Sequence, residues 1–201
     1  MKKIYMLQGD GNLRVGVLAI QGSVREHIEK LNLIDGVEAV LAKDKNTLLS
    51  LDALIIPGGE STAIGKMIVD FGLKEAILKL NERKIPIWGT CAGMILMAKY
   101  IVNDDKVHLG IMDISVKRNA YGSQLDSFKT KLMIPAVSNN EIEAVFIRAP
   151  YIENVGNGVR ILAKHQGKIV AAQQDNLLAT SFHPELTDDL SFYKYFLRLN
   201  S

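Results

Sequence analysis

Residues 85–97 read IPIWGTCAGMILM, and this stretch decides the fold that we expect. Its first part, residues 85–88, is a short apolar run that predicts a buried strand, and residues 92–101 carry the apolar period of a helix. Between them lies a G-x-C-x-G pattern centred on Cys91. A strand that turns sharply into a helix holds its corner residue in a strained backbone conformation, and small flanking residues let neighbouring backbone approach. The stretch therefore predicts a strand–turn–helix unit that presents the Cys91 side chain outward.

The same alternation of strand and helix extends outward from this unit through the first half of the chain. We expect strands at residues 15–20, 37–42, 53–56 and 85–88, and helices at residues 24–33, 62–69, 73–82 and 92–101. After Leu109 the strand-like runs are closely spaced, which favours antiparallel pairing: they lie at residues 111–117, 144–147, 159–163, 169–173 and 178–181. A last amphipathic helix is expected at residues 190–199. This order predicts an α/β sandwich whose central sheet is mostly parallel and is covered by helices.

The composition of the 201 residues is typical of a folded globular protein, with 48% hydrophobic and 23% charged residues. We expect one domain over residues 14–201, and residues 1–13 form an N-terminal extension of undetermined origin. The 24 basic residues are scattered and nearly balance the 22 acidic ones, so nucleic acid is not an expected partner. One cysteine excludes an internal disulfide, and no apolar run approaches the roughly 20 residues that span a bilayer. These features favour a cytoplasmic protein with no membrane partner.

Cys91 is expected to act as a nucleophile. The N-terminus of the following helix offers free N–H groups and the positive end of a dipole, both of which favour a thiolate and a developing oxyanion. A lone cysteine is also commonly just a small buried hydrophobic residue. A merely packed cysteine does not need a complete elbow between a strand and a helix, so the elbow favours the nucleophile.

A thiol nucleophile needs a base, and position selects His183 among the four histidines. His183 follows an apolar strand, and Glu185 stands two residues further on. Extended residues at i and i+2 point to the same side, and Pro184 restricts the backbone between them. A carboxylate bonded to one imidazole nitrogen sets the tautomer and leaves the other nitrogen for the thiol, although His-Pro-Glu also occurs as an ordinary turn with a solvated acid. The remaining histidines lie in polar surroundings and are expected at the surface: His27, His108 and His165.

Residues 57–62 read PGGEST and directly follow the strand expected at residues 53–56. The two glycines leave backbone amides exposed, and in a doubly wound sheet ligands collect at the carboxyl ends of strands. One amide from Gly59 and one from Ala92 are therefore expected to form an oxyanion hole. Ser61 or Thr62 is an alternative explanation for part of the motif, because either could cap the next helix.

The elbow, the Gly-Gly loop and the terminal His-x-Glu, in this order, resemble the class I glutamine amidotransferases. Further strings narrow the resemblance: VLAIQGSVREH at residues 17–27, RNAYG at 118–122, FIRAP at 146–150 and SFHPEL at 181–186. Together they are similar to the glutaminase subunit of pyridoxal 5'-phosphate synthase, and the resemblance runs from about Val15 to the C-terminal helix.

The resemblance implies a flavodoxin-like three-layer sandwich and the hydrolysis of L-glutamine to glutamate and ammonia, with no metal and no cofactor. It implies that the ammonia passes to a synthase subunit of the TIM-barrel type, within a large hetero-oligomer that makes vitamin B6. Glutamine carries an α-carboxylate and an α-ammonium group, which need arginine and carboxylate partners respectively. By motif match, the residues that hold glutamine are Gly58, Gly59, Glu60, Arg118, Ile147 and Arg148.

Two other functions are compatible with parts of the pattern. A cysteine-elbow hydrolase of the DJ-1 type shares a similar fold, but such a protein has no reason to carry His183 and Glu185 beside Arg118 and Arg148. A non-catalytic binding subunit is expected to have lost a member of the triad, and the sequence retains Cys91, His183 and Glu185.

Overall fold

The computed structural model describes residues 12–118 and 127–200. The first half contains β1 (Leu13–Leu18), α1 (Val24–Leu31), β2 (Val37–Ala42), α2 (Lys45–Leu49), β3 (Ala53–Ile56), α3 (Ser61–Asp70), α4 (Lys74–Glu82), β4 (Ile87–Thr90) and α5 (Ala92–Met97). The second half contains β5 (Ala98–Ile101), β6 (Met112–Lys117), β7 (Ser127–Met133), β8 (Glu141–Ile147), β9 (Tyr151–Val155), β10 (Arg160–His165), β11 (Lys168–Gln174) and β12 (Leu177–Thr180). A 3-10 turn (Pro184–Leu186), helix α6 (Ser191–Leu197) and a second 3-10 turn (Arg198–Asn200) follow.

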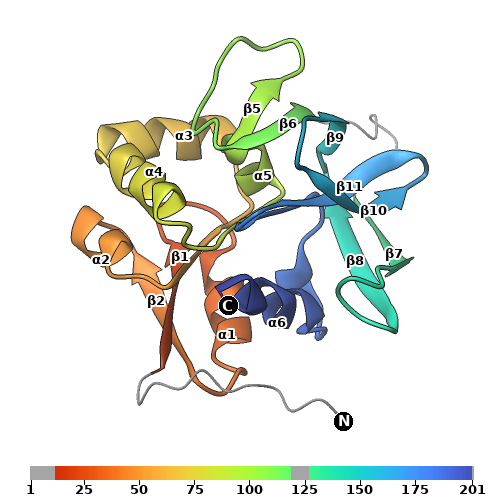
Figure 1. Cartoon of the computed structure of the whole chain (residues 1–201), viewed down its shortest axis with the longest axis horizontal. Helices are drawn as coiled ribbons and strands as arrows, with labels where there is room; N and C mark the ends of the chain where they lie inside the picture. The colour runs from red at the N-terminus through yellow and green to blue at the C-terminus, as the bar shows by residue number, and fades with distance from the viewer. Residues whose placement is uncertain (1–11, 119–126, 201) are drawn as a thin grey trace.

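One large sheet organises these elements, with strand order β2-β1-β3-β4-β12-β11-β9-β6-β5 and with β10 paired to β11. The pairs β2–β1, β1–β3, β3–β4 and β4–β12 are parallel, and the pairing turns antiparallel at β12–β11. The expected change from a parallel first half to a mainly antiparallel second half is therefore confirmed, except that β5 and β6 pair in parallel. Figure 1 shows the strands of this sheet running through the middle of the molecule.

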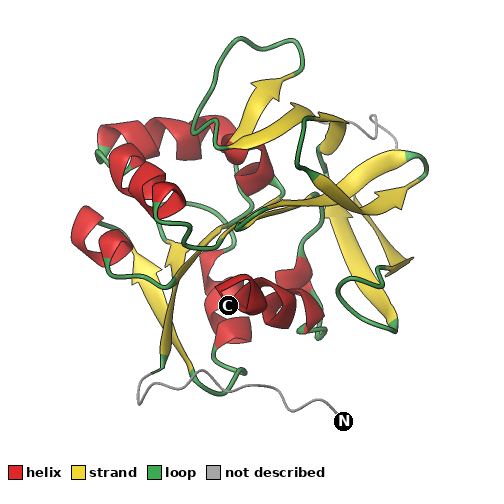
Figure 2. Cartoon of the chain, viewed as in Figure 1, coloured by secondary structure: helices red, strands yellow, loops and turns green. Residues whose placement is uncertain are grey.

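Helices cover both faces of the parallel part of the sheet, which makes three layers. Figure 2 shows α2, α3, α4 and α5 on one side and α1 and α6 on the other. Alternation along β3 explains this arrangement, since Leu54 and Ile56 belong to the core under α3–α5 while Ala53 and Ile55 belong to the core under α1 and α6. Among the described residues, no helix is long and apolar enough to cross a membrane.

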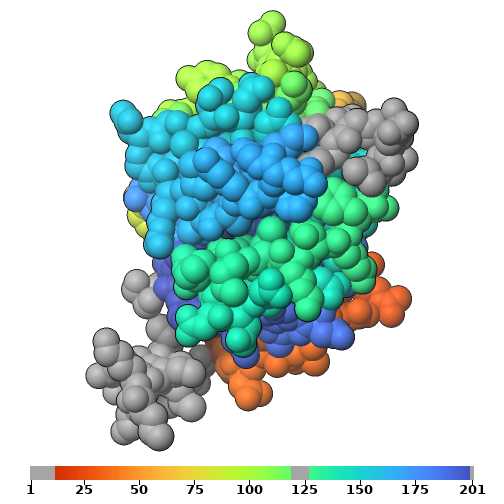
Figure 3. All heavy atoms as spheres, turned by 90° about the vertical axis from the view of Figure 1, so that its right-hand side faces the viewer, coloured from red at the N-terminus to blue at the C-terminus, as the bar shows by residue number. Residues whose placement is uncertain are grey.

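Several elements in both halves of the chain differ from expectation. The helix expected over residues 92–101 ends at Met97, because Ala98–Ile101 instead pairs in parallel with β6 at the end of the sheet. Helix α2 and strands β7 and β9 were not predicted from the sequence. β7 and β8 form a separate two-stranded sheet, which lies beside the β10–β11 hairpin at one end of the molecule (Figure 3).

The prediction that three histidines lie at the surface is wrong for His27 and His108, and His165 is half-buried. His27 is fully buried because it occupies the same face of α1 as Leu31, while its polar sequence neighbours face outward. His108 packs against Gly65, where an added Cβ would lie 2.0 Å from the His108 Nδ1 atom. His165 stacks on Phe128 and Phe146, with ring centroids 5.4 and 5.7 Å away.

Replacing Gly93 with alanine is expected to lower the free energy of unfolding by about 3 kcal/mol, at the upper end of the usual cost of overpacking. An added Cβ would lie 2.0 Å from the carbonyl oxygen of Ile56, so α5 and β3 would have to separate. Urea unfolding measures the change. The matched control is Gly158→Ala, where no atom lies within 4 Å and only the positive φ of +77° opposes a side chain, at about 1 kcal/mol. An equal loss in the two variants would contradict the close-packing explanation.

Candidate active site

Cys91 occupies the corner between β4 and α5, as the sequence predicts. Its backbone angles are φ 47° and ψ −104°, a combination that residues with a Cβ rarely adopt. The strand and the helix come so close here that an added Cβ on Gly89 would lie 2.5 Å from the carbonyl carbon of Gly93. The Cys91 N–H donates to the carbonyl of Thr180 at 2.8 Å, which ties the corner to β12. The elbow therefore directs the sulfur atom away from the core and into a pocket.

His183 lies just beyond β12, the strand next to β4, and its position is fixed from both sides. Its N–H donates to the carbonyl of Val145 at 2.8 Å, and its Nδ1 lies 2.7 Å from Oε1 of Glu185. Residues Pro184–Leu186 form a 3-10 turn, so this turn brings the imidazole and the carboxylate together, and the extended backbone that we expected is wrong. The hydroxyl of Ser23 donates to the same Oε1 at 2.7 Å.

The charges of this pair stabilise each other. Burial disfavours the imidazolium of His183, but hydrogen bonds with Cys91 and Glu185 and the charge of Glu185 outweigh burial and raise the pKa of His183 to about 10. Burial likewise disfavours the carboxylate of Glu185, but hydrogen bonds from His183 and the Ser23 hydroxyl, together with the charge of His183, outweigh it and lower the pKa of Glu185 to about 2. His183 therefore holds a proton near neutral pH, and Glu185 stays ionised.

The stability of the chain is expected to depend on pH through this pair. The contribution of His183 is fully present below its unfolded pKa of 6.5 and is lost as the pH rises towards about 10. The contribution of Glu185 is fully present above its unfolded pKa of 4.5 and is lost as the pH falls towards about 2. The free energy of unfolding of the unsubstituted chain should therefore exceed that of the Glu185→Gln variant, and the difference should be largest between pH 4.5 and 6.5. Urea titrations of both proteins at several pH values measure the difference, and a difference that grows above pH 6.5 would contradict the pairing.

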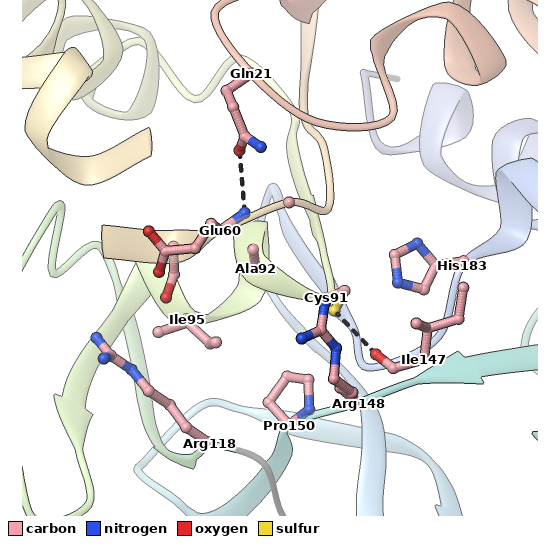
Figure 4. A pocket seen from close by; sticks show the side chains of 12 residues that line it. Gln21, Glu60, Cys91, Ala92, Ile95, Arg118, Ile147, Arg148, Pro150 and His183 are labelled. Carbon is pink, nitrogen blue, oxygen red and sulfur yellow. Dashed lines mark hydrogen bonds between the residues drawn. The ribbon is translucent and has the colours of Figure 1, made fainter. Parts of the chain in front are cut away.

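A pocket of about 470 Å³ opens in front of Cys91. Figure 4 shows Cys91 at its centre, with Glu60 and Arg118 on one side and His183 on the other. The carbonyl oxygen of Ile147 lies 4.0 Å from the sulfur atom. The lining residues are Gln21, Gly59, Glu60, Ser61, Cys91, Ala92, Ile95, Arg118, Ile147, Arg148, Pro150 and His183.

The two amides expected to form an oxyanion hole both belong to residues that line this pocket. Within residues 12–118 and 127–200, neither the N–H of Gly59 nor that of Ala92 donates to another residue. Ala92 is the first residue of α5, so its N–H is one of the free donors at a helix N-terminus. Two unpaired donors beside a nucleophile can stabilise negative charge on a carbonyl oxygen.

Gly58 does not line the pocket, but a glycine is needed at this position because it lies against His183 and Cys91. A Cβ at this position would lie 2.5 Å from Cε1 of His183 and 3.4 Å from the Cβ of Cys91. The carbonyl of Gly58 accepts a hydrogen bond from the N–H of Ser23 at 3.0 Å. The first glycine of the loop therefore leaves room for the cysteine and the histidine and orients the peptide that carries the Gly59 N–H.

Two of the charged residues expected to hold glutamine, Glu60 and Arg118, lie at the side of the pocket away from His183 (Figure 4). Glu60 caps α3 by accepting from the N–H groups of Thr62 (2.9 Å) and Ala63 (2.7 Å), so the expectation of a Ser61 or Thr62 cap is wrong. The hydrogen bond from Thr62 is the main cause that lowers the pKa of the Glu60 carboxyl. Arg118 Nη2 lies 3.2 Å from Asp104 Oδ2, yet within the described part of the chain Arg118 Nε and Nη2 form no hydrogen bond. Residues 119–122 of the expected RNAYG motif lie outside the described residues.

Sequence reasoning missed several residues of the pocket, namely Gln21, Ser61, Ile95 and Pro150. Gln21 accepts the Glu60 N–H at 3.0 Å, and a Cβ on Gly59 would lie 2.4 Å from its Oε1 (Figure 4). Gln21 follows β1, so the rule that ligands collect at the carboxyl ends of parallel strands could have found it. Arg148 has a positive φ of 41°, a strained conformation that no sequence pattern signalled.

A cysteine at a strand–helix corner, a histidine paired with a buried carboxylate and two free amides define a class of protein: an α/β cysteine hydrolase built for acyl transfer from an amide. Among the described residues, no group of three or more His, Cys, Asp and Glu side chains could hold a metal ion.

Comparisons with known proteins narrow the class. The model of the SNO glutamine amidotransferase family matches residues 17–200. The chain is 98% identical to the pyridoxal 5'-phosphate synthase subunit PdxT of Thermoanaerobacter sp. (strain X514), over 94% of this chain and 100% of the relative. It is 82% identical to the PdxT subunit of Caldanaerobacter subterraneus subsp. tengcongensis, with the same coverage. A solved structure, described as a glutamine amidotransferase, superposes with a TM-score of 0.87 at 43% identity, over 92% of this chain and 98% of the other. The chain belongs to the SNO glutamine amidotransferase family.

Proposed function

We propose that this chain hydrolyses L-glutamine to L-glutamate and ammonia, and supplies the ammonia to a pyridoxal 5'-phosphate synthase subunit for vitamin B6 biosynthesis. The observation that carries the proposal is the convergence of Cys91, the His183–Glu185 pair and two free amides on one pocket. Family membership and relatives named as pyridoxal 5'-phosphate synthase subunits support the substrate and the role of the product.

Hydrolysis proceeds through a thioester. The sulfur of Cys91 attacks the side-chain amide carbon of glutamine, and the N–H groups of Gly59 and Ala92 stabilise the oxyanion. His183 gives its proton to the amide nitrogen as the C–N bond breaks, which releases ammonia and leaves a glutamyl thioester on Cys91. His183 then takes a proton from water as the water oxygen attacks the thioester. The C–S bond breaks, glutamate leaves, and Glu185 holds the imidazole in place throughout.

Recognition of glutamine rests on Glu60 and Arg118, at the far side of the pocket from His183, and on Arg148, which lies beside Cys91 (Figure 4). Glu60 stays ionised because helix-capping hydrogen bonds lower the pKa of its carboxyl, and it binds the α-ammonium group. Arg118 has two nitrogen atoms without hydrogen bonds to described residues and binds the α-carboxylate together with Arg148. The Ile147 backbone lies beside the sulfur and contacts the reacting amide.

Two alternatives remain distinguishable by experiment. Family membership disfavours a DJ-1-type cysteine-elbow hydrolase. A non-catalytic binding subunit is disfavoured because Cys91, His183 and Glu185 are all present and adjacent. A glutaminase assay separates the proposed enzyme from both alternatives, since only the proposed enzyme releases ammonia from glutamine.

The partner in our proposal is a synthase subunit of the TIM-barrel type, in a large hetero-oligomer that contains several copies of each chain. A reduced thiol nucleophile favours a reducing compartment, so we assign the reaction to the cytoplasm. Residues 14–201 form the single glutamine amidotransferase domain in this proposal, and residues 1–13 lie outside it.

The partner is proposed to dock on residues 21–27 and to act through the Gly58–Gly59 peptide. Gly22 and Arg25 of this segment are exposed, and beside them a cavity of about 490 Å³ is lined by Val24, Ile28 and the half-exposed Leu41. The Ser23 N–H donates to the Gly58 carbonyl, so pressure on this segment can rotate the peptide that carries the Gly59 N–H. His27 takes part only through its backbone, because its side chain is buried.

The isolated chain is expected to hydrolyse glutamine weakly and to be stimulated about 10²-fold by a cognate synthase subunit, which requires only about 2.7 kcal/mol of differential stabilisation. Ammonia release is measured at one glutamine concentration with and without saturating partner. Arg25→Glu should lower the stimulated rate, because Arg25 is exposed within the docking segment. The matched control Arg83→Glu changes an exposed arginine at the end of α4 and should not. Equal rates with and without partner would contradict the switch and leave the roles of Cys91, His183 and Glu185 untouched.

A further inference from the structure

Two buried polar side chains behind Glu185 take no part in the reaction described above. His27, from α1, and Tyr193, from α6, are each fully buried, and Thr90, at the end of β4, is fully buried beside them. The Tyr193 hydroxyl lies 2.7 Å from Nδ1 of His27, and His27 Nε2 lies 3.3 Å from Thr90 Oγ1. Burying polar groups in a core of Trp88 and phenylalanines is costly unless each group has a partner, so this cluster needs an explanation.

The hydrogen bonds select one tautomer of His27. A buried tyrosine hydroxyl needs an acceptor, and the acceptor that the described residues offer to Tyr193 is Nδ1 of His27. Burial lowers the pKa of His27 more than the nearby charge of Glu185 raises it, so the ring is neutral and carries one proton. With Nδ1 accepting from Tyr193, that proton lies on Nε2. His27 therefore presents an N–H donor on the side that faces Thr90 and Glu185.

Glu185 has one carboxylate oxygen that lacks a hydrogen-bond donor among the described residues. Its Oε1 is bonded by His183 Nδ1 and by the Ser23 hydroxyl, each at 2.7 Å. Its Oε2 is buried and has no hydrogen bond among the described residues. His27 Nε2 lies 3.5 Å from this oxygen, long for a hydrogen bond but within the range that a small rotation of the carboxylate closes. One oxygen of the carboxylate thus serves His183, while the other lies against the N–H of His27.

We propose that His27, held in its Nε2–H tautomer by Tyr193, is a positioning residue that fixes the carboxylate plane of Glu185 and thereby the orientation of His183. The inference rests on the proposed function, because it deepens the role of the same triad. His27 touches neither substrate nor the reacting sulfur. It acts through Glu185, and a neutral donor does so without adding a positive charge that would compete with the His183 imidazolium.

A purely structural role is the competing explanation. The His27 ring packs edge-on against Trp88, with centroids 6.1 Å apart, and in a tilted arrangement against Tyr193, with centroids 5.8 Å apart, so any substitution also disturbs the core. A packing role predicts that stability and turnover fall together. A positioning role predicts that turnover depends on whether residue 27 offers an N–H donor to Glu185, whatever the change in stability.

The first test reads the tautomer directly and needs no activity. In the complete chain, a long-range ¹H–¹⁵N NMR spectrum should show His27 as the neutral Nε2–H tautomer at neutral pH. Tyr193→Phe should shift the ring towards a mixture of tautomers, because Nδ1 loses its donor. A neutral Nδ1–H tautomer in the unsubstituted chain would overturn the proposal, since Nε2 could then only accept.

The second test measures turnover with saturating synthase subunit. His27→Leu should lower kcat about 10- to 100-fold, the usual effect of an outer-shell partner, with KM changed less than about twofold. His27→Gln, which keeps an N–H donor, should recover most of kcat. In a Glu185→Gln background, His27→Leu should have no further effect on kcat. The matched control Phe192→Leu trims the same core without removing a polar group and should lower the melting temperature while leaving kcat within about twofold.

The outcomes separate the inference from the proposed function. No ammonia release from the unsubstituted complex would defeat the proposed function, and the NMR experiment would still decide on the tautomer. An active complex in which His27→Leu, His27→Gln and Phe192→Leu all keep kcat within about twofold would overturn the positioning role alone. Equal losses in His27→Leu and His27→Gln would overturn it too, because restoring the donor would then have no effect.

Discussion

Replacing Cys91 with alanine is expected to reduce glutamine hydrolysis by at least about 10⁴-fold, to the level of the assay background. The change removes the atom that forms the thioester, and the chain has no second cysteine to replace it. Steady-state ammonia release with saturating synthase subunit measures the loss. The fold should persist because alanine occupies less space at the corner, although the positive φ of 47° stays strained.

Glutamine binding provides the control for this substitution. Glu60, Arg118 and Arg148 are unchanged in Cys91→Ala, so calorimetry should detect glutamine binding by the inactive variant in the complex. Normal ammonia release from Cys91→Ala would remove Cys91 from the mechanism. The pocket would then need another nucleophile, such as a water molecule activated by His183.

The second large effect is expected for Glu185→Gln, which should lower kcat by about 10⁴-fold, by analogy with the loss of the carboxylate in a serine protease triad. In this variant the side-chain amide nitrogen at position 185 can only donate to His183 Nδ1, so it favours the tautomer that carries its proton on Nε2. The nitrogen left for Cys91 can then no longer act as a base. The same substitution removes the charge that raises the pKa of His183. kcat at saturating glutamine measures the effect, and circular dichroism checks that the fold is intact.

A matched control separates this effect from a general loss of charge. Glu29→Gln neutralises an exposed glutamate on α1 that pairs with Arg25, and it should leave the intrinsic rate of the isolated chain within about twofold. A loss of less than tenfold in Glu185→Gln would remove Glu185 from the triad. The inferred role of His27 would then have no carboxylate to act through.

The parallel half of the fold could be predicted because local and global signals agree there. Residues such as Leu54 and Ile55 are apolar on both faces of β3, which is the pattern of a strand buried between two helical layers. The elbow at Cys91 could be predicted because a side chain at either of its two glycines would clash where α5 approaches β3 and β4. The approach between Gly89 and Gly93 acts between near neighbours in sequence, so a short motif records it.

Features that depend on distant contacts could not be predicted. The sequence around Ala98–Ile101 continues the apolar period of α5, and only pairing with Met112–Lys117 turns it into a strand. His27 has charged neighbours in sequence and was expected at the surface, but Tyr193 lies 166 residues away and supplies the partner that makes burial possible. Tertiary contacts overrode the local pattern in both places.

The residues of the candidate site likewise fall into those that local motifs predict and those that they do not. Cys91, His183 and Glu185 were found from short motifs. The structure places Cys91 and His183 in one pocket and Glu185 behind His183, while the catalytic roles of all three remain predictions. Arg118 and Arg148 were found only through the family resemblance, because no spacing rule connects either arginine to the elbow. Gln21 was assigned to the partner surface, yet it also lines the pocket, which places the end of β1 between the proposed docking segment and the site.

The proposed reaction requires that Cys91 forms a covalent bond with the side-chain carbon of glutamine. This bond is tested by labelling the partner-activated enzyme with a diazoketone analogue of glutamine, followed by digestion and mass spectrometry. We predict one adduct per chain, located on Cys91, blocked by excess glutamine and absent from Cys91→Ala. A sample that releases ammonia from glutamine but carries no adduct on Cys91, or an equal degree of labelling in Cys91→Ala, would contradict the proposed reaction.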